Sequence, residues 1–147
     1  MEIHLDPHDK HIRRAFRVPT GRVRERFGKV ADPGFQPVPD VLLFHQADLE
    51  LSSEELNVLL NLMAHWYEPE RMPFPRAATI AHRMGVSERT VQRLLSRLCK
   101  RGFIAKIKEQ NVTGAKAYDL RPLIKKLGPY AQKRLALYPR AHDGEAV

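Results

Sequence analysis

Arginine and glutamine side chains recur at helical spacing in the stretch that runs from residue 87 to residue 101. Arg89, Gln92 and Arg93 are three and four residues apart, so about 100° per residue places them on adjoining parts of one helix surface. Arginine forms paired hydrogen bonds with guanine, and glutamine does so with adenine. The chemistry to expect is therefore the reading of base edges. The base-reading candidates are Ser87, Arg89, Gln92, Arg93 and Ser96.

A second group of polar and cationic residues surrounds these candidates in the sequence. Their side chains suit contacts with phosphate oxygens, which position a protein on DNA without reading its sequence. This group comprises Arg76, Thr90, Arg97, Lys100, Lys106, Lys108 and Lys116. The opposite side of the same predicted helix carries Val91, Leu95 and Leu98, which we expect to face a core.

The distribution of charge supports a polyanionic partner. The chain has 147 residues and a net charge of +8. Residues 1–39 carry +3, residues 40–74 carry −6, residues 75–108 carry +8 and residues 109–147 carry +3. A concentrated basic patch attracts nucleic acid more strongly than dispersed charge does. We therefore predict double-stranded DNA as the partner, the alternative being an ordinary solvated basic face.

Two short helices must hold these residues. The first is expected from Arg76 to Met84, with Gly85 free to take the positive φ of a tight turn. Ser87 then caps a second helix that stops at Gly102. An earlier helix begins with the capping box formed by Ser52 and Glu55, and the segment 38–51 before it is predicted as a short helix or a strand-like lead-in.

A hairpin is expected to follow the second helix. Residues 103–109 alternate in polarity, which places Phe103, Ala105 and Ile107 on one face of a strand, and residues 115–120 form the returning strand. A last helix is predicted over 122–138, where Gly128 and Pro129 should kink or split it. The chain thus divides into a basic arm at 1–38, a domain at 39–120 and a C-terminal helix and tail at 121–147.

The N-terminal arm is rich in proline and arginine and shows no sustained period. We expect it to be extended, with a short strand or helical turn, and free to reach adjacent DNA. Its candidate DNA contacts are Arg13, Arg14, Arg17, Arg22, Arg24 and Arg26.

The order of elements predicts a mainly α protein with a small β-hairpin, namely a winged helix-turn-helix. The spacing of Ala81, Gly85, Val91 and Leu94 resembles the helix-turn-helix pattern of bacterial DNA-binding proteins. The longer segment "SSEELNVLLNLMAHWYEPERMPFPRAATIAHRMGVSERTVQRLLSRLCKRGFI" is similar to a bacterial, phage and plasmid family of winged-helix regulators and replication-associated proteins, and the resemblance covers about residues 38–120. The resemblance implies that residues 87–101 form the recognition helix in the major groove and that residues 103–120 form the wing.

We expect a sequence-specific DNA-binding protein that acts as a transcriptional regulator. One alternative is a replication or partition protein of a plasmid or phage, and another is a winged-helix module that binds proteins. We predict no enzyme, cofactor or metal site, because no phosphate loop, nucleophile motif or four-ligand cluster occurs in the sequence.

The remaining expectations concern location and assembly. The N-terminus lacks the apolar core of a secretory signal, and Cys99 is the single cysteine, so we expect a cytoplasmic protein with no membrane partner. The apolar stripe of the last helix could fold back on the first helix of the domain or pair two copies in a homodimer, and we lean to the homodimer. The stripe comprises Leu123, Leu127, Ala131, Leu135 and Tyr138.

Overall fold

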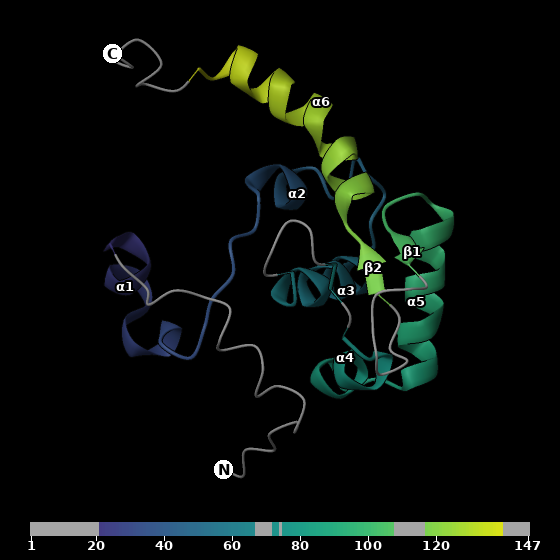
Figure 1. Cartoon of the computed structure of the whole chain (residues 1–147). Helices are drawn as coiled ribbons and strands as arrows, with labels where there is room; N and C mark the ends of the chain where they lie inside the picture. Colours follow the sequence, from purple (N-terminus) through teal and green to yellow (C-terminus); the bar gives the residue numbers. More distant parts are fainter. Residues whose placement is uncertain (1–20, 67–71, 74, 108–116, 140–147) are drawn as a thin grey trace.

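The computed structural model describes residues 21–66, 72–73, 75–107 and 117–139. These residues are mainly helical, with one small antiparallel sheet, and their core lies where α3, α4 and α5 meet the hairpin, with α2 and the first part of α6 also contributing to it (Figure 1). Val58, Leu59, Ile80, Val91 and Leu98 are fully buried in that core. The arrangement is winged-helix-like, in agreement with the expected fold class.

Helix α3 (Ser53–Ala64) provides the platform of the domain. Its capping box is present as predicted: the Glu55 amide donates to the Ser52 hydroxyl oxygen at 3.0 Å, and the Ser52 amide donates to Glu55 Oε1 at 3.0 Å. These two bonds satisfy amides that have no partner inside the helix. The helix then buries its apolar face against α5.

Helices α4 (Ala77–Met84) and α5 (Glu88–Lys100) form the predicted helix-turn-helix. Gly85 ends α4 in the left-handed conformation, with φ of 68°, which a residue without a side chain adopts at little cost. Ser87 caps α5 by accepting a hydrogen bond from the Thr90 amide at 3.1 Å. Arg76 precedes α4 and makes no side-chain cap.

Strands β1 (Ala105–Ile107) and β2 (Ala117–Asp119) pair in antiparallel register, with Lys106 opposite Tyr118. The Tyr118 amide also donates to the Pro73 carbonyl at 2.9 Å, which ties the hairpin to the segment before α4. The predicted alternation was wrong at its start, since Ile104 is buried and Ala105 is exposed. The chain leaves α5 through Gly102 at φ of 75° and bends at Phe103, so strand pairing begins only at Ala105.

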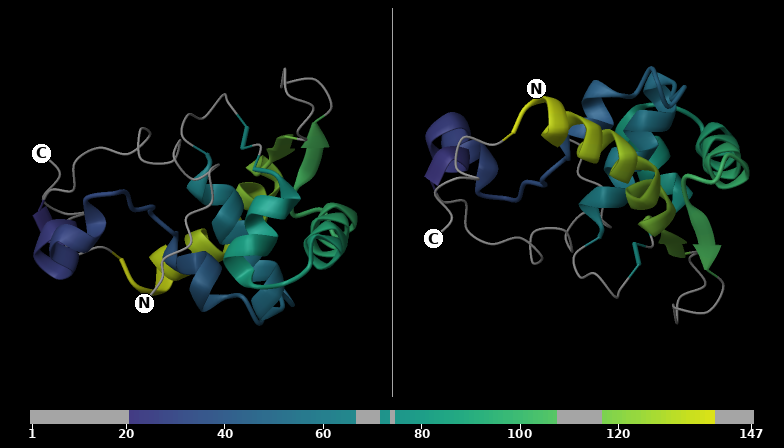
Figure 2. Two further views of the ribbon diagram at one scale, coloured as in Figure 1. Left: turned by 90° about the horizontal axis from the view of Figure 1, so that it is seen from below. Right: turned by 90° about the horizontal axis from the view of Figure 1, so that it is seen from above.

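Part of the predicted extended arm is helical. Helix α1 (Gly21–Phe27) is followed by the 3-10 helix η2 (Gly28–Ala31), and α1 buries none of its residues. Helix α2 (Asp40–Phe44) then decides between the two predictions for the lead-in segment in favour of a helix. Figure 2 shows α1 at the end of the structure far from α5 in both views.

Helix α6 (Arg121–Leu137) continues through Pro129, so of the predicted kink or split, the split does not occur (Figure 1). Pro129 is exposed, and the carbonyl that its missing N–H would have bonded belongs to Lys125, which is also exposed. Water can therefore satisfy that carbonyl without a break in the helix. Leu123 and Leu127 are buried in the domain core, whereas Leu135 and Tyr138 are 48% and 70% exposed.

Candidate nucleic-acid interface

Helix α5 separates its apolar and cationic side chains onto opposite faces. Val91, Leu94, Leu95 and Leu98 are buried, as the sequence predicts. The base-reading candidates on this helix and at its cap all have exposed side chains: Ser87, Arg89, Gln92, Arg93 and Ser96. The burial of one face is a property of the fold, and the exposure of the other makes a row of hydrogen-bond donors available to a ligand.

Local hydrogen bonds already hold part of the helix start. The Ser87 and Thr90 hydroxyl oxygens lie 2.9 Å apart, and Ser87 also accepts from the Thr90 amide. Gln92 Nε2 lies 3.4 Å from Glu88 Oε1, a long hydrogen bond between exposed groups. Ser87 is thus primarily a helix cap, while Gln92 keeps its carbonyl oxygen and most of its donor capacity for an outside partner.

The phosphate candidates border this face from three elements. Arg76 is exposed at the start of α4, Arg97 and Lys100 are exposed on α5, and Lys106 is exposed on β1. Thr90 is half-buried and is held by Ser87. Lys108 and Lys116, which we expect on the wing, lie outside the described residues.

The arm candidates are not brought together with α5. Arg22, Arg24 and Arg26 are exposed on α1, at the far end of the structure (Figure 2). Arg24 lies 3.8 Å from Asp32, and the Arg26 guanidinium stacks over the Phe27 ring at 4.9 Å. Arg13, Arg14 and Arg17 lie outside the described residues.

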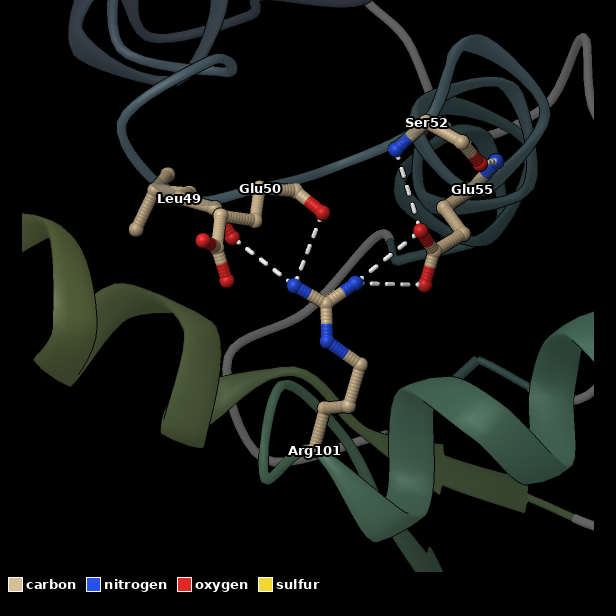
Figure 3. Close-up of polar contacts among 5 residues, drawn as sticks. All are labelled: Leu49, Glu50, Ser52, Glu55 and Arg101. Atoms are coloured by element: carbon tan, nitrogen blue, oxygen red, sulfur yellow. Dashed lines mark hydrogen bonds and ion pairs between the residues drawn. The ribbon is translucent and has the colours of Figure 1, made fainter.

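Sequence reasoning missed the part that Arg101 plays in the fold. Its Nη1 donates to Glu55 Oε1 and Oε2 at 2.9 and 2.8 Å (Figure 3). Its Nη2 donates to the carbonyls of Leu49 and Glu50 at 2.9 and 2.8 Å. The charge of Arg101 is therefore matched inside the domain and adds little to the DNA-facing surface. A capping box predicts the Ser52 partner of Glu55, but nothing local in the sequence predicts a second partner 46 residues away.

Glu55 remains ionised although it is 2% exposed. Burial acts to raise its pKa, but the hydrogen bonds from the Ser52 amide and from Arg101, together with the charge of Arg101, outweigh burial and lower the pKa. Arg83, another cation of the basic segment, likewise lies 3.2 Å from Asn61 of α3 and 3.1 Å from His65, the residue that follows α3.

Two negative findings apply to the described part of the chain. It contains no group of three or more histidine, cysteine, aspartate or glutamate side chains placed to hold a metal ion. None of its helices combines the length and apolar character needed to cross a membrane.

The fold and the exposed cationic face of α5 define a winged-helix-like domain with the features of a nucleic-acid-binding module. The sequence profile of the DnaD N-terminal domain matches residues 38–135. The chain belongs to the DnaD N-terminal domain family.

Individual relatives agree with this membership. The replicative helicase loading/DNA remodeling protein DnaD of Bacillus subtilis is 28% identical over 111 residues, which are 74% of this chain and 47% of that protein. This chain therefore spans about half the length of that relative. The crystal structure of the N-terminal domain of DnaD from Geobacillus kaustophilus is 35% identical, with a TM-score of 0.54 over 71% of this chain and 86% of that one.

A more distant likeness is to the PcaV transcriptional regulator from Streptomyces coelicolor, which is 22% identical with a TM-score of 0.40. Similarity at this level does not bear on function.

Proposed function

We propose that the chain is a double-stranded DNA-binding module of the replication apparatus, which contributes to helicase loading or DNA remodelling. Family membership supports a role in replication, because the name of the Bacillus subtilis relative includes both replicative helicase loading and DNA remodeling. These comparisons favour the replication alternative over the transcriptional regulator that we expected first. The chain acts by binding in this proposal, and no catalytic step is assigned to it.

The observation that carries DNA binding is the face of α5. Arg89, Gln92 and Arg93 are exposed near the start of a helix whose other side is wholly engaged in the core. In a helix-turn-helix, side chains near the start of the second helix reach base edges in the major groove. We assign base contacts to these three residues and to Ser96, with Ser87 fixing the helix start.

The backbone contacts in this proposal come from the border of the same face. Arg76, Thr90, Arg97, Lys100 and Lys106 would meet phosphates, and Lys108 and Lys116 would extend that contact along the wing. The arm arginines have a separate role. Since α1 lies far from α5, Arg22, Arg24 and Arg26 would contact a second stretch of DNA or another molecule.

The test is selection of duplexes from a random-sequence pool by the full chain, followed by footprinting of the recovered sequence in replication-origin and promoter fragments. Protection of repeated sites in the origin fragment supports the replication role. Protection confined to an inverted repeat at a promoter supports the regulator instead. Binding that is equal for every duplex contradicts sequence-specific reading and leaves only phosphate contact.

A protein-binding role has one observation in its favour. Leu43 and Phe44 of α2 are 51% and 55% exposed, and Tyr138 at the end of α6 is 70% exposed. Arg134 stacks over the rings of Phe44 and Tyr138, at 5.0 and 5.9 Å, so these two rings lie close to one another. Clustered exposed apolar side chains favour association with a protein surface.

A further inference from the structure

Arg101 occupies the point where the C-terminal end of α5 meets the segment that joins α2 to α3. Its guanidinium makes four hydrogen bonds to three residues, all between 2.8 and 2.9 Å (Figure 3). We infer that Arg101 is a positioning residue, which sets the angle of α5 on α3 and thereby the aim of the base-reading side chains. This inference rests on the proposed DNA-binding function.

The geometry of the four bonds requires arginine. One nitrogen serves both carboxylate oxygens of Glu55, and the other serves two backbone carbonyls that diverge from it. A planar guanidinium presents donors in this fixed fork, whereas a lysine ammonium is a single point of charge on a flexible chain. Lysine at position 101 would keep the charge but lose the simultaneous contacts.

The carbonyls on the other side are also held in place. Glu50 is a non-glycine residue with φ of 55°. The Glu50 amide donates to the Ala47 carbonyl, and the Leu51 amide donates to the Gln46 carbonyl, both at 2.9 Å. These two bonds close the turn that precedes Glu50. Left-handed geometry is unfavourable for a non-glycine residue, and the bond from Arg101 to the Glu50 carbonyl offsets part of that cost.

The two ends of α5 are therefore fixed by different devices. Its N-terminal end is joined to α4 through the turn at Gly85, and its C-terminal end is fixed to α3 through Arg101 and Glu55. The leucines between them pack in a core that has no directional bonds of its own. Apolar packing alone defines the rotation and tilt of α5 only loosely. The directional hydrogen bonds at its C-terminal end define them more sharply.

The first readout is a distance that does not involve DNA. Spin labels on Asn57→Cys in α3 and Ser96→Cys in α5, in a chain carrying Cys99→Ser, report the separation of the two helices by pulsed electron paramagnetic resonance. We expect Arg101→Lys to shift or broaden the distance distribution. Arg121→Lys is the matched control, since Arg121 pairs with Asp119 through a similar fork at the start of α6. It should leave the distribution unchanged.

A milder variant keeps the inference testable if Arg101→Lys does not fold. Glu55→Gln retains an oxygen for the Ser52 amide but removes the carboxylate charge and one acceptor from Arg101. A folded Glu55→Gln chain with the same distribution as the unsubstituted chain would overturn the inference.

The second readout is recognition. The probes are the duplex selected from the random pool by the unsubstituted chain and a random-sequence duplex of the same length. The measurement is made at a temperature where circular dichroism shows each chain fully folded. Arg101→Lys should lower the ratio of the affinity for the selected duplex to the affinity for the random duplex about fivefold or more, because part of one base contact is lost. Affinity for the random duplex should stay within about twofold, since phosphate contacts dominate it.

The outcomes separate this inference from the proposed function. If the unsubstituted chain does not distinguish the two duplexes, sequence-specific DNA reading fails, and the distance measurement alone decides whether Arg101 sets the angle of α5. If the distance shifts and the affinity ratio does not change, Arg101 is a structural residue only and its positioning role is overturned.

Discussion

Arg93 and Arg101 are eight residues apart, yet their guanidinium groups have different surroundings. Arg93 is exposed on the face of α5 opposite the core, and Arg101 is half-buried against a carboxylate and two carbonyls. A count of basic residues treats them alike. The structure separates side chains that are free to meet a ligand from those whose charge is already matched within the fold.

Substitution of single residues should separate base reading from phosphate contact. Arg93→Ala, Arg89→Ala or Gln92→Ala is expected to cost roughly 1–3 kcal/mol on the selected duplex and much less on random DNA, because a base contact is lost. Lys106→Ala should weaken both about equally. Fluorescence anisotropy with the two duplexes measures the difference. An unchanged selected-to-random ratio for Arg93→Ala would show that α5 does not read bases.

Acid should reveal the ion pair of Glu55. Its pKa is lowered in the folded chain from the ordinary value of 4.5, so its ionised form stabilises the fold fully above that value. This contribution is lost as the pH falls through the lower folded-state pKa. Urea unfolding at neutral pH and at a series of acidic pH values should give a free energy of unfolding that falls more for the unsubstituted chain than for Glu55→Gln. Parallel curves would contradict the prediction.

Among the elements, the turn between α4 and α5 depends most on one backbone conformation. Gly85→Ala should lower the free energy of unfolding by roughly 1 kcal/mol, since a side chain disfavours φ of 68° although nothing lies within 4 Å of the added carbon. Gly128→Ala is the contrasting variant, because Gly128 lies inside α6 and also has open space around it.

The Gly128→Ala chain should be more stable by about 0.5–1 kcal/mol, as alanine favours helix. Thermal or urea unfolding of both variants checks the opposite signs. Equal effects of the two substitutions would show that the conformation of Gly85 is unimportant.

Elements whose signals are local in the sequence were predicted well. The capping box of Ser52 and Glu55, the turn at Gly85 and the cap at Ser87 each depend on residues within five positions, and all three are present. The sequence left open whether Pro129 kinks or splits α6, because the outcome depends on which side of the helix Pro129 faces. That side is decided by the burial of Leu123 and Leu127 in a core built from distant segments.

In the candidate site too, features with local sequence signals could be predicted, and features that depend on distant segments could not. The exposed face of α5 could be predicted because helical periodicity alone assigns Val91 and Arg93 to different faces. The role of Arg101 could not, because its partners Leu49, Glu50 and Glu55 belong to another part of the chain. The separation of α1 from α5 is also a tertiary property, which no composition or spacing indicates.

For the whole molecule, the proposed phosphate contacts predict a steep dependence on salt. If about five of them form, the logarithm of the affinity should fall against the logarithm of the salt concentration with a slope of roughly −4 to −5. Titrations of the full chain with the random duplex over a range of salt concentrations measure this slope. Replacing Lys100 with alanine should make it shallower by about one. An affinity that does not change with salt would contradict the phosphate assignments.

Assembly into a homodimer stays a prediction, with a smaller surface than the sequence suggested. Leu123 and Leu127 are already buried within the chain and Ala131 is half-buried, which leaves mainly Leu135 and Tyr138 of the original stripe for a second copy. Sedimentation of the full chain and of Leu135→Ser with Tyr138→Ser should show a dimer only for the former. A monomer at all accessible concentrations, with and without duplex DNA, would contradict the homodimer.

The uninterrupted course of α6 has a geometric consequence for anything joined to its end. Residues 128–137 extend beyond the buried leucines and span roughly 15 Å at 1.5 Å per residue, and within them Tyr130 and Arg134 contact His45 and Phe44 at the end of α2. Each residue inserted after Arg134 would leave these contacts in place and turn an attached fluorophore or fused protein by about 100° around the helix axis. Its orientation relative to the domain could thus be set in regular steps, and after seven insertions it would return close to its starting direction.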